Sequence, residues 1–390
     1  MSDQGSSQTR YDPETEKRLS ELRSGIDSFD KQIASLINQR ATLAAEIGLL
    51  KRNQKAPVYV PHREAAVYQK IAEANSGPLP DNALKAIYRE IMSATIALQR
   101  PTRVCYFGAP GSFSHTAAYN KFGSGVDYLH TSGMEDVFRE VSNENADFGV
   151  IPIENSTEGT VSAAVDLLAE THLKASGELF LQVHHNLLSI CSRNDIDIIF
   201  SHPQPFGQCR NWLTANYPNA ELRPTRSTSA AAKEAAETPR SAAIASRLAS
   251  ELYNVPVLHA NIEDIQNNIT RFFVIGRSLA ERTGNDKTSL VFSVKDEPGA
   301  LLRMLMPFED NKVNLTKIES RPSRRKAWEY IFFVDFIGHH TDENAIKAIE
   351  TLRDHCRFLE IIGSYPVASM PDSSSDGGRR IEPINNLDKK

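Results

Sequence analysis

Apolar residues recur every three or four positions along the first hundred residues of the chain. The stripe runs over about four heptads and consists of Leu19, Leu22, Ile26, Phe29, Ile33, Leu36, Leu43, Ile47 and Leu50. Position 40, where the stripe should continue, is an arginine. A second helical pattern follows Pro61, and a third follows Asp81, a suitable N-cap. These patterns predict an all-α module at 16–100, with one long helix and two shorter ones.

Residues 103–277 alternate short β-type runs with helical runs. The β-type runs are 104–108, 148–153, 179–190, 196–201 and 271–276, and the helical runs lie near 114, 162–169 and 206–216. Such alternation favours an α/β domain with parallel strands. Because the pattern restarts at 196, we expect two similar lobes with a cleft between them.

The third part of the chain, 288–366, reads β, α, β, β, α, β. Its runs are 289–294, 299–308, 313–320, 330–337, 345–352 and 358–363. This order is typical of ferredoxin-like modules. A polar linker at 282–287 precedes it, and the polar segments 1–15 and 370–390 are predicted to be disordered tails.

Composition excludes several classes of protein. The 390 residues carry 44 Lys+Arg against 49 Asp+Glu, a formal charge of −5, which argues against a polybasic binder of nucleic acid or membranes. No apolar run approaches the roughly 18 residues of a membrane helix. Four distant cysteines and an N-terminus without a signal pattern predict a reduced, cytoplasmic protein. The eleven histidines show no metal-ligand spacing, so we expect neither a metal nor a cofactor.

Arg40 occupies a core position of its helix, and Thr95 and Gln99 continue the stripe of the third helix. Two interpretations remain open: Arg40 pairs with Glu64 or Glu46 and sets the register, or it binds an anion. Lys51, eleven residues later, returns to nearly the same face about 16 Å away, so the two cations can straddle one small anion. Arg23 lies about 25 Å from Arg40 on another face, and reaches that ligand only from a partner chain.

The runs LSELRSGIDSFDKQIASLINQRATLAAEIGLLK and PHREAAVYQKI resemble the all-helical chorismate mutase family, which forms intertwined dimers. The resemblance implies that Arg23 is donated across the dimer, that Arg40 binds a substrate carboxylate and that Lys51 donates to the ether oxygen. It also implies that Arg63 adds to the anion clamp, that Glu64 binds the ring hydroxyl, and that Thr95 and Gln99 complete the pocket. The reaction is pericyclic, so the enzyme need only hold the compact conformer and stabilise charge on the ether oxygen. Val60 stands where some relatives carry an acid.

Polar loops follow the β-type runs of the middle domain, where open α/β folds bind their ligands. They are 108–115, which also suits an ordinary helix cap, 154–159 and 201–209, and a further polar cluster, 267–273, lies at the start of the last β-type run. Together they resemble the prephenate dehydratase family over 103–277. The resemblance implies that the Thr270 hydroxyl assists departure of the ring hydroxyl while decarboxylation drives aromatisation to phenylpyruvate. It further implies that Asn155, Ser156, Thr157, Gln208 and Ser112 line the cleft, and that Arg271 or backbone amides hold substrate carboxylates.

Two motifs of the third module, Glu297-Pro298-Gly299-Ala300-Leu301-Leu302 and Ile318-Glu319-Ser320-Arg321-Pro322, resemble the ACT regulatory domain. By pattern alone the module could serve dimerisation. The resemblance implies that phenylalanine binds between two subunits, at Glu297, Gly299, Ala300, Leu301, Glu319, Ser320, Arg321 and Pro322.

The resemblances together imply a multidomain, bifunctional enzyme of phenylalanine biosynthesis that is inhibited by L-phenylalanine. The expected fold is a helical mutase module, a two-lobed α/β dehydratase domain like the periplasmic binding proteins, and a βαββαβ ACT domain. We expect a homodimer or higher homo-oligomer, with chorismate and prephenate as substrates and with neither nucleic acid nor membrane as a partner. One alternative is a dehydratase whose helical module is only a dimerisation device. Another is a non-catalytic amino-acid sensor, against which Thr270-Arg271-Phe272 argues.

Overall fold

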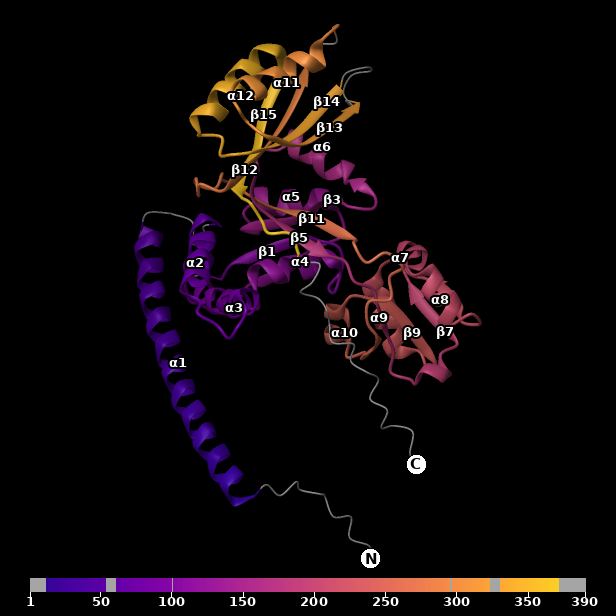
Figure 1. Ribbon diagram of the computed structural model, residues 1–390. Coiled ribbons are helices and arrows are strands. Elements are labelled where there is room, and N and C mark those ends of the chain that lie inside the picture. The colour runs from indigo at the N-terminus through magenta and orange to yellow at the C-terminus, as the bar shows by residue number, and fades with distance from the viewer. Residues whose placement is uncertain (1–11, 54–60, 100, 295–296, 323–329, 372–390) are drawn as a thin grey trace, which may run out of the picture.

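The computed structural model describes residues 12–53, 61–99, 101–294, 297–322 and 330–371, and it describes residues 51–53 without their side chains. The first hundred residues form the helices α1 (Pro13–Asn53), α2 (Pro61–Ala74) and α3 (Asp81–Gln99). Helix α3 packs against both others, and the far half of α1 stands away from the rest of the molecule (Figure 1). The all-α module is therefore confirmed.

Helix α1 begins inside the segment predicted to be a disordered tail. Asp12 Oδ1 accepts hydrogen bonds from the backbone N–H groups of Glu14 and Thr15, each at 3.0 Å. Pro13 is the first helical residue, where its missing N–H costs nothing. The prediction for residues 13–15 is therefore wrong, because a local cap stabilises a first turn of polar residues. Residues 1–11 and 372–390 lie outside the described part of the chain.

The apolar stripe of α1 is uncovered along most of its length. Eight of its nine members are between 49% and 67% exposed, and they are Leu22, Ile26, Phe29, Ile33, Leu36, Leu43, Ile47 and Leu50. Within the part of the chain that the structure describes, a long apolar helix face therefore has no partner surface, which is uncommon in monomeric proteins.

The larger of two sheets runs through the dehydratase and ACT parts of the chain. Its order is β13-β14-β12-β15-β5-β11-β3-β1-β2, with β4 added beside β3. The dehydratase strands are β1 (Arg103–Phe107), β2 (Asp127–Thr131), β3 (Phe148–Asn155), β4 (Gly159–Thr160), β5 (Lys174–Gln182) and β11 (Ile269–Gly276), with helices α4 (Phe113–Phe122), α5 (Met134–Ser142) and α6 (Ser162–Glu170). Strand β1 is parallel to β2 and β3, but β11 is antiparallel to both β3 and β5. The expected parallel sheet is thus mixed.

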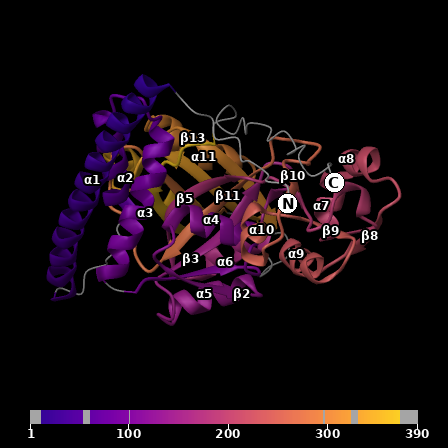
Figure 2. The same cartoon turned by 90° about the horizontal axis from the view of Figure 1, so that it is seen from below.

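The smaller sheet, β10-β6-β9-β7-β8, forms the second lobe and confirms the two-lobed architecture. Its strands are β6 (Asn186–Leu188), β7 (Ile198–Ser201), β8 (Glu221–Pro224), β9 (Ser241–Ala245) and β10 (Val257–His259), with η1 (Arg193–Asp195), α7 (Pro203–Gln208), α8 (Arg210–Asn216), α9 (Thr228–Glu237) and α10 (Arg247–Tyr253). Figure 2 shows this lobe beside the larger sheet. The single strand predicted at 179–190 is wrong: β5 ends in one sheet and β6 begins in the other. Polar residues at 182 and 184–186 interrupt this run, so its pattern fits two short strands as well as one long strand.

The C-terminal part has the predicted βαββαβ order. It consists of β12 (Asp286–Val294), α11 (Ala300–Asp310), β13 (Leu315–Pro322), β14 (Tyr330–Ile337), α12 (Glu343–His355) and β15 (Cys356–Pro366). Strand β15 pairs in parallel with β5, where Gly363 lies opposite Ala175. A Cβ at Gly363 would collide with the Ala175 carbonyl oxygen, so this junction requires glycine.

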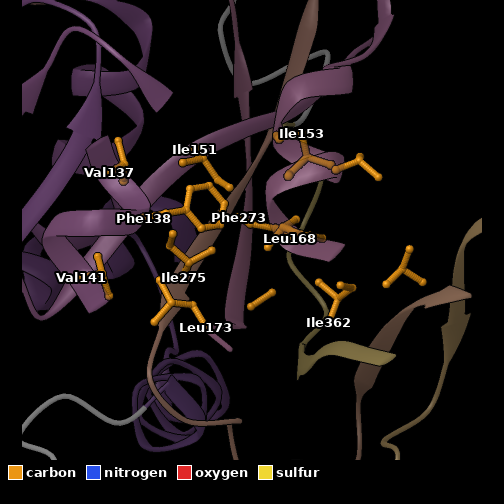
Figure 3. Close-up of a cluster of buried hydrophobic side chains, with 14 of the residues drawn as sticks. Val137, Phe138, Val141, Ile151, Ile153, Leu168, Leu173, Phe273, Ile275 and Ile362 are labelled. Atoms are coloured by element: carbon orange, nitrogen blue, oxygen red, sulfur yellow. The ribbon is translucent and has the colours of Figure 1, made fainter. Parts of the chain in front are cut away.

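Strand β11 is buried on both faces. Phe273 and Ile275 pack with Ile151 and Ile153 of β3 and with Ile362 and Tyr365 of β15, in the core shown in part in Figure 3. Phe272 and Val274 belong to a second core on the opposite face, together with Ala117 and Ala118 of α4. Since side chains alternate along a strand, odd-numbered residues of β11 face α5, α6 and the C-terminal strands, and even-numbered residues face α4.

Candidate active sites

Thr270 and Asn155 meet across β11 and β3. The two residues are register partners, and Asn155 Nδ2 donates to Thr270 Oγ1 at 2.8 Å and to Asn268 Oδ1 at 2.7 Å. Thr270 is 9% exposed. Because its oxygen accepts this bond, its own hydrogen can be donated to another group. The pair therefore presents an oriented hydroxyl donor on the α4 face of the sheet.

Asn155 also folds the loop that follows it. Its Oδ1 accepts from Thr157 N at 3.0 Å and from Thr157 Oγ1 at 2.6 Å. Ser156 Oγ donates to the Asn267 carbonyl at 3.0 Å and accepts from Ile269 N at 2.9 Å. The hydroxyls of Ser156 and Thr157 thus bind the chain itself and hold the loop beside Thr270.

Gln208, at the end of α7, contacts a histidine that the sequence did not single out as a site residue. Gln208 Oε1 lies 2.7 Å from Nε2 of His185, which is 1% exposed. Burial lowers the pKa of His185, so the neutral ring can donate Nε2–H to this oxygen. The adjacent pair His184-His185 was the feature of the sequence that could have indicated this residue. The sequence indicated one continuous strand there, whereas His185 lies in the crossing between lobes.

Ser112 caps α4, and its Oγ accepts from His115 N at 3.2 Å. The loop before it also contacts the second lobe, where Ser246 Oγ donates to the Gly111 carbonyl at 2.6 Å and Ser229 Oγ bonds to the Pro110 carbonyl. Gln204 of α7 likewise contacts Glu158 across the lobes. The loop 108–115 therefore acts as a helix cap and as part of the junction between lobes.

Arg271 points to the other face of the sheet from Thr270. Its guanidinium is 6% exposed and lies 2.7 Å from Glu178 and 2.5 Å from Asp335 of β14. Burial alone would lower the pKa of Arg271, but Tyr365, Asp335 and Glu178 outweigh it and raise the pKa above its ordinary value. Because these buried partners occupy the guanidinium, the expectation that it holds a substrate carboxylate does not fit this geometry.

Three of the residues expected in the mutase pocket lie where α1 and α3 meet. Arg40 Nη1 donates to Thr95 Oγ1 at 3.4 Å, and Thr95 is 5% exposed. Gln99 packs against Gly48, where an added Cβ would lie 2.6 Å from Gln99 Cγ. Arg40 and Thr95 are thus brought together, and Gln99 lies about two helical turns further along α1.

Glu64 of α2 has a partner from another domain. Its Oε2 lies 2.7 Å from Lys121 Nζ of α4, and its Oε1 accepts from Tyr68 at 3.2 Å. Arg63 is exposed beside it, and Arg23 is exposed on the far half of α1. Lys51 is helical, but its side chain and the whole of Val60 lie outside the described residues.

The two effector motifs flank the ACT sheet. Gly299, at φ +80°, precedes α11, and Glu297 pairs with Arg303 at 2.8 Å. Ala300 begins α11, Leu301 is 57% exposed, and Ser320 and Pro322 are exposed on β13. Glu319 and Arg321 face the dehydratase domain instead: Glu319 contacts Thr160, and Arg321 pairs with Asp166 at 3.0 Å. The two motifs thus do not form one open surface within a single chain.

In the described part of the chain, no helix is both long and apolar enough to span a membrane.

Comparison with known proteins places all three modules. The sequence matches the families chorismate mutase type II over 22–100, prephenate dehydratase over 104–279 and ACT domain over 288–354. It is 42% identical over 361 residues to the bifunctional chorismate mutase/prephenate dehydratase of Aquifex aeolicus, covering 91% of this chain and 100% of that protein. The corresponding protein of Pseudomonas aeruginosa is 40% identical over 358 residues, covering 90% of this chain and 98% of that protein.

Among solved structures, the prephenate dehydratase of Arthrobacter aurescens in complex with L-Phe matches with a TM-score of 0.63 and 31% identity, covering 68% of this chain and 90% of that one. These matches cover the helical, α/β and βαββαβ parts in the order observed here. The chain therefore belongs to the bifunctional chorismate mutase/prephenate dehydratase family of phenylalanine biosynthesis.

Proposed function

We propose that Thr270 assists the dehydration of prephenate by donating its hydroxyl hydrogen to the departing ring hydroxyl. The observation that carries this role is the 2.8 Å bond from Asn155 Nδ2, which occupies the threonine oxygen as an acceptor. Loss of carbon dioxide supplies the electron pair that aromatises the ring as hydroxide leaves, assisted by hydrogen bonding. Asn155 orients Thr270, and Ser156 and Thr157 hold the loop in place. Gln208 and Ser112 lie at the edge of the junction between the two lobes.

The mutase reaction needs cations around a dianion rather than a nucleophile. Arg40 is proposed to bind a carboxylate of chorismate, with Arg63 adding to the clamp, while Lys51 and Gln99 stabilise charge on the ether oxygen. Glu64 binds the ring hydroxyl, and Thr95 holds Arg40. The contact between Arg40 and Thr95 and the packing of Gln99 on Gly48 support a common pocket.

A second copy of the chain is proposed to cover the exposed stripe of α1. Eight large apolar side chains that are at least 49% exposed would otherwise remain in water. Arg23 lies on the N-terminal half of this helix, too far from Arg40 to reach the same ligand within one chain. The mutase pocket is then completed by the partner's arginine, and the assembly is at least a homodimer.

Phenylalanine is proposed to bind the ACT domain and inhibit the dehydratase. The relative from Arthrobacter aurescens was solved with L-Phe, which supports this ligand. The residues proposed to contact it are Glu297, Gly299, Ala300, Leu301, Ser320 and Pro322, which lie around α11 and on the exposed face of β13. Glu319 and Arg321 would join them only by giving up their contacts with Thr160 and Asp166. The cytoplasmic location stays a prediction from the sequence.

One experiment tests these assignments together. Purified protein is incubated with chorismate, with and without phenylalanine, and chorismate, prephenate and phenylpyruvate are followed separately. We expect chorismate to be consumed and phenylpyruvate to form, and phenylalanine to suppress phenylpyruvate. Conversion of prephenate by a protein that leaves chorismate untouched would reduce the helical module to a dimerisation device.

A further inference from the structure

Two neighbouring residue pairs of β3 and β11 face opposite sides of the sheet. Asn155 is the register partner of Thr270, and Glu154 is the register partner of Arg271. Because side chains alternate along both strands, the first pair faces α4 and the second faces the ACT domain. Thr270 is therefore one peptide unit from a residue held by another domain.

Arg271 is held by a buried network of charged and hydroxyl groups. Its Nε donates to Glu178 Oε2 at 2.8 Å, its Nη1 donates to Asp335 Oδ2 at 2.5 Å, and its Nη2 donates to the Tyr365 hydroxyl at 2.9 Å. Lys287 Nζ lies 2.8 Å from Glu178, so two cations balance two anions. Asp335, Tyr365 and Lys287 all belong to ACT strands. The guanidinium of Arg271 therefore faces the ACT domain.

Glu154, the register partner of Arg271, also contacts the ACT domain. Lys317 of β13 places its Nζ 2.8 Å from Glu154 Oε2 and 3.0 Å from Thr160 Oγ1. Thr160 also contacts Glu319, in the effector motif on the same strand. Strands β13 and β14 thus hold the ACT-facing pair from two sides.

We propose that Arg271 is a positioning residue, which sets the place of Thr270 from the ACT domain and does not bind prephenate. A displacement of β14 moves Asp335, and with it Arg271 and the backbone of Thr270. A displacement of β13 moves Glu154 and the backbone of Asn155 through Lys317. Either change alters the 2.8 Å contact that orients the Thr270 hydroxyl. This inference rests on the proposed role of Thr270 and, for its regulatory part, on phenylalanine as the effector.

The test uses the full-length protein with prephenate as substrate and three variants. Arg271→Lys keeps the charge but loses the planar fork. Tyr365→Phe removes only the hydroxyl that accepts from Arg271 and contacts Ser289 Oγ at 2.5 Å, and its folding is checked by thermal unfolding. Asp335→Asn weakens the link to β14. The matched controls are Arg277→Lys, whose partners Val141, Ala146 and Asp147 lie in the dehydratase domain, and Asp342→Asn, which weakens the ACT-side pair with Arg282.

We expect Arg271→Lys to lower kcat by roughly 10- to 100-fold with KM changed less than about threefold, and Tyr365→Phe to lower kcat by roughly 3- to 10-fold. In Asp335→Asn, the fold inhibition produced by saturating phenylalanine should be at least about fivefold smaller than in the wild type. The Kd for phenylalanine, measured by calorimetry, should change less than about twofold. Both control variants should keep wild-type kcat and inhibition.

A raised KM with kcat retained in Arg271→Lys would make Arg271 a substrate ligand and overturn the proposal. Unchanged inhibition in a folded Asp335→Asn variant would do the same for its regulatory part. If the wild-type enzyme shows no response to phenylalanine, the proposed effector is wrong, and the division between kcat and KM in Arg271→Lys and Tyr365→Phe still decides the positioning role. If Thr270→Ala retains full turnover, Thr270 is not the catalytic residue. The variants at Arg271, Tyr365 and Asp335 do not by themselves reveal this outcome.

Discussion

Lys121 of the dehydratase domain and Glu64 of the mutase module form an ion pair, with Lys121 Nζ 2.7 Å from Glu64 Oε2. The Glu64 side chain is only 10% exposed. Lys121 lies in the last turn of α4, the helix that Ser112 caps at its other end. One short helix therefore connects the loop at the proposed dehydratase site to a residue proposed for the mutase pocket.

Replacing Lys121 with methionine should impair the mutase. The change removes the Lys121 cation from Glu64 Oε2 and leaves the hydrogen bond from Tyr68, so we expect Glu64 to shift from the position proposed to bind the ring hydroxyl. We expect KM for chorismate to rise roughly 3- to 10-fold, with prephenate dehydration unchanged. Steady-state kinetics with each substrate measure both. The control is Lys70→Met, on the exposed surface of α2. An unaltered KM in Lys121→Met would mean that the ion pair does not contribute to the mutase site.

Substitution of Thr270 should separate the two activities. Thr270→Ala removes the hydroxyl donor, and we expect phenylpyruvate formation to fall by roughly 100-fold or more, while chorismate is still converted to prephenate. Thr270→Ser keeps a hydroxyl beside Asn155 and should retain much more activity. Turnover of prephenate by Thr270→Ala at the wild-type rate would refute the catalytic role.

Two glycines of α1 should respond differently to alanine. A Cβ at Gly48 would lie 2.6 Å from Gln99 Cγ, whereas nothing lies within 4 Å of a Cβ at Gly25. Gly25→Ala should raise the free energy of unfolding by up to about 1 kcal/mol, since alanine favours helix. Gly48→Ala should lose that gain and lower mutase activity, because Gln99 must move. Chemical denaturation and chorismate turnover give both readings, and similar behaviour of the two variants would argue against close packing of Gln99.

Mixing two inactive mutase variants should restore activity if the pocket is shared between chains. Arg23→Ala and Arg40→Ala each remove one cation, and a mixed dimer contains one pocket with both arginines intact. For random exchange of equal amounts, we expect roughly a quarter of the wild-type mutase activity, since half of the dimers are mixed and each has one complete pocket. Subunit exchange is verified first with differently tagged chains. No recovery after complete exchange would place Arg23 outside the pocket.

Acidification should destabilise the fold through buried histidines. Burial lowers the pKa of His185 from 6.5, and it acts in the same direction on His115 and His259. The unfolded chain therefore binds more protons than the native chain below about pH 6.5, so the free energy of unfolding falls as the pH falls through that range. Urea midpoints at pH 7.5 and 5.5 measure the change.

The histidine variants isolate the contribution of one ring. His185→Gln should reduce the difference between the two midpoints, whereas His172→Gln, at an exposed position, should keep it. Equal pH dependence in all three proteins would mean that His185 does not contribute.

The contrast between Thr270 and Arg271 shows how far sequence reasoning reached in the catalytic motif. The motif identified both residues, and strand alternation already requires them to face opposite sides. Which side meets the ACT domain depends on Asp335, 64 residues later in the chain. Lys121 shows the same limit, because it pairs with a residue 57 positions earlier in another module.

The sequence by itself determined the helical module, the alternation of the middle domain, the βαββαβ order and the motifs that indicate the family, because helix and strand periodicities are local. Only the tertiary structure decided that the β-type run at 179–190 divides between two sheets, that β11 is antiparallel to its neighbours, and that the ACT domain shares a core with the dehydratase domain. The physical reason is that strand pairing and buried charge pairs join residues far apart in sequence. Their geometry is set by how complete elements pack, which no local pattern contains.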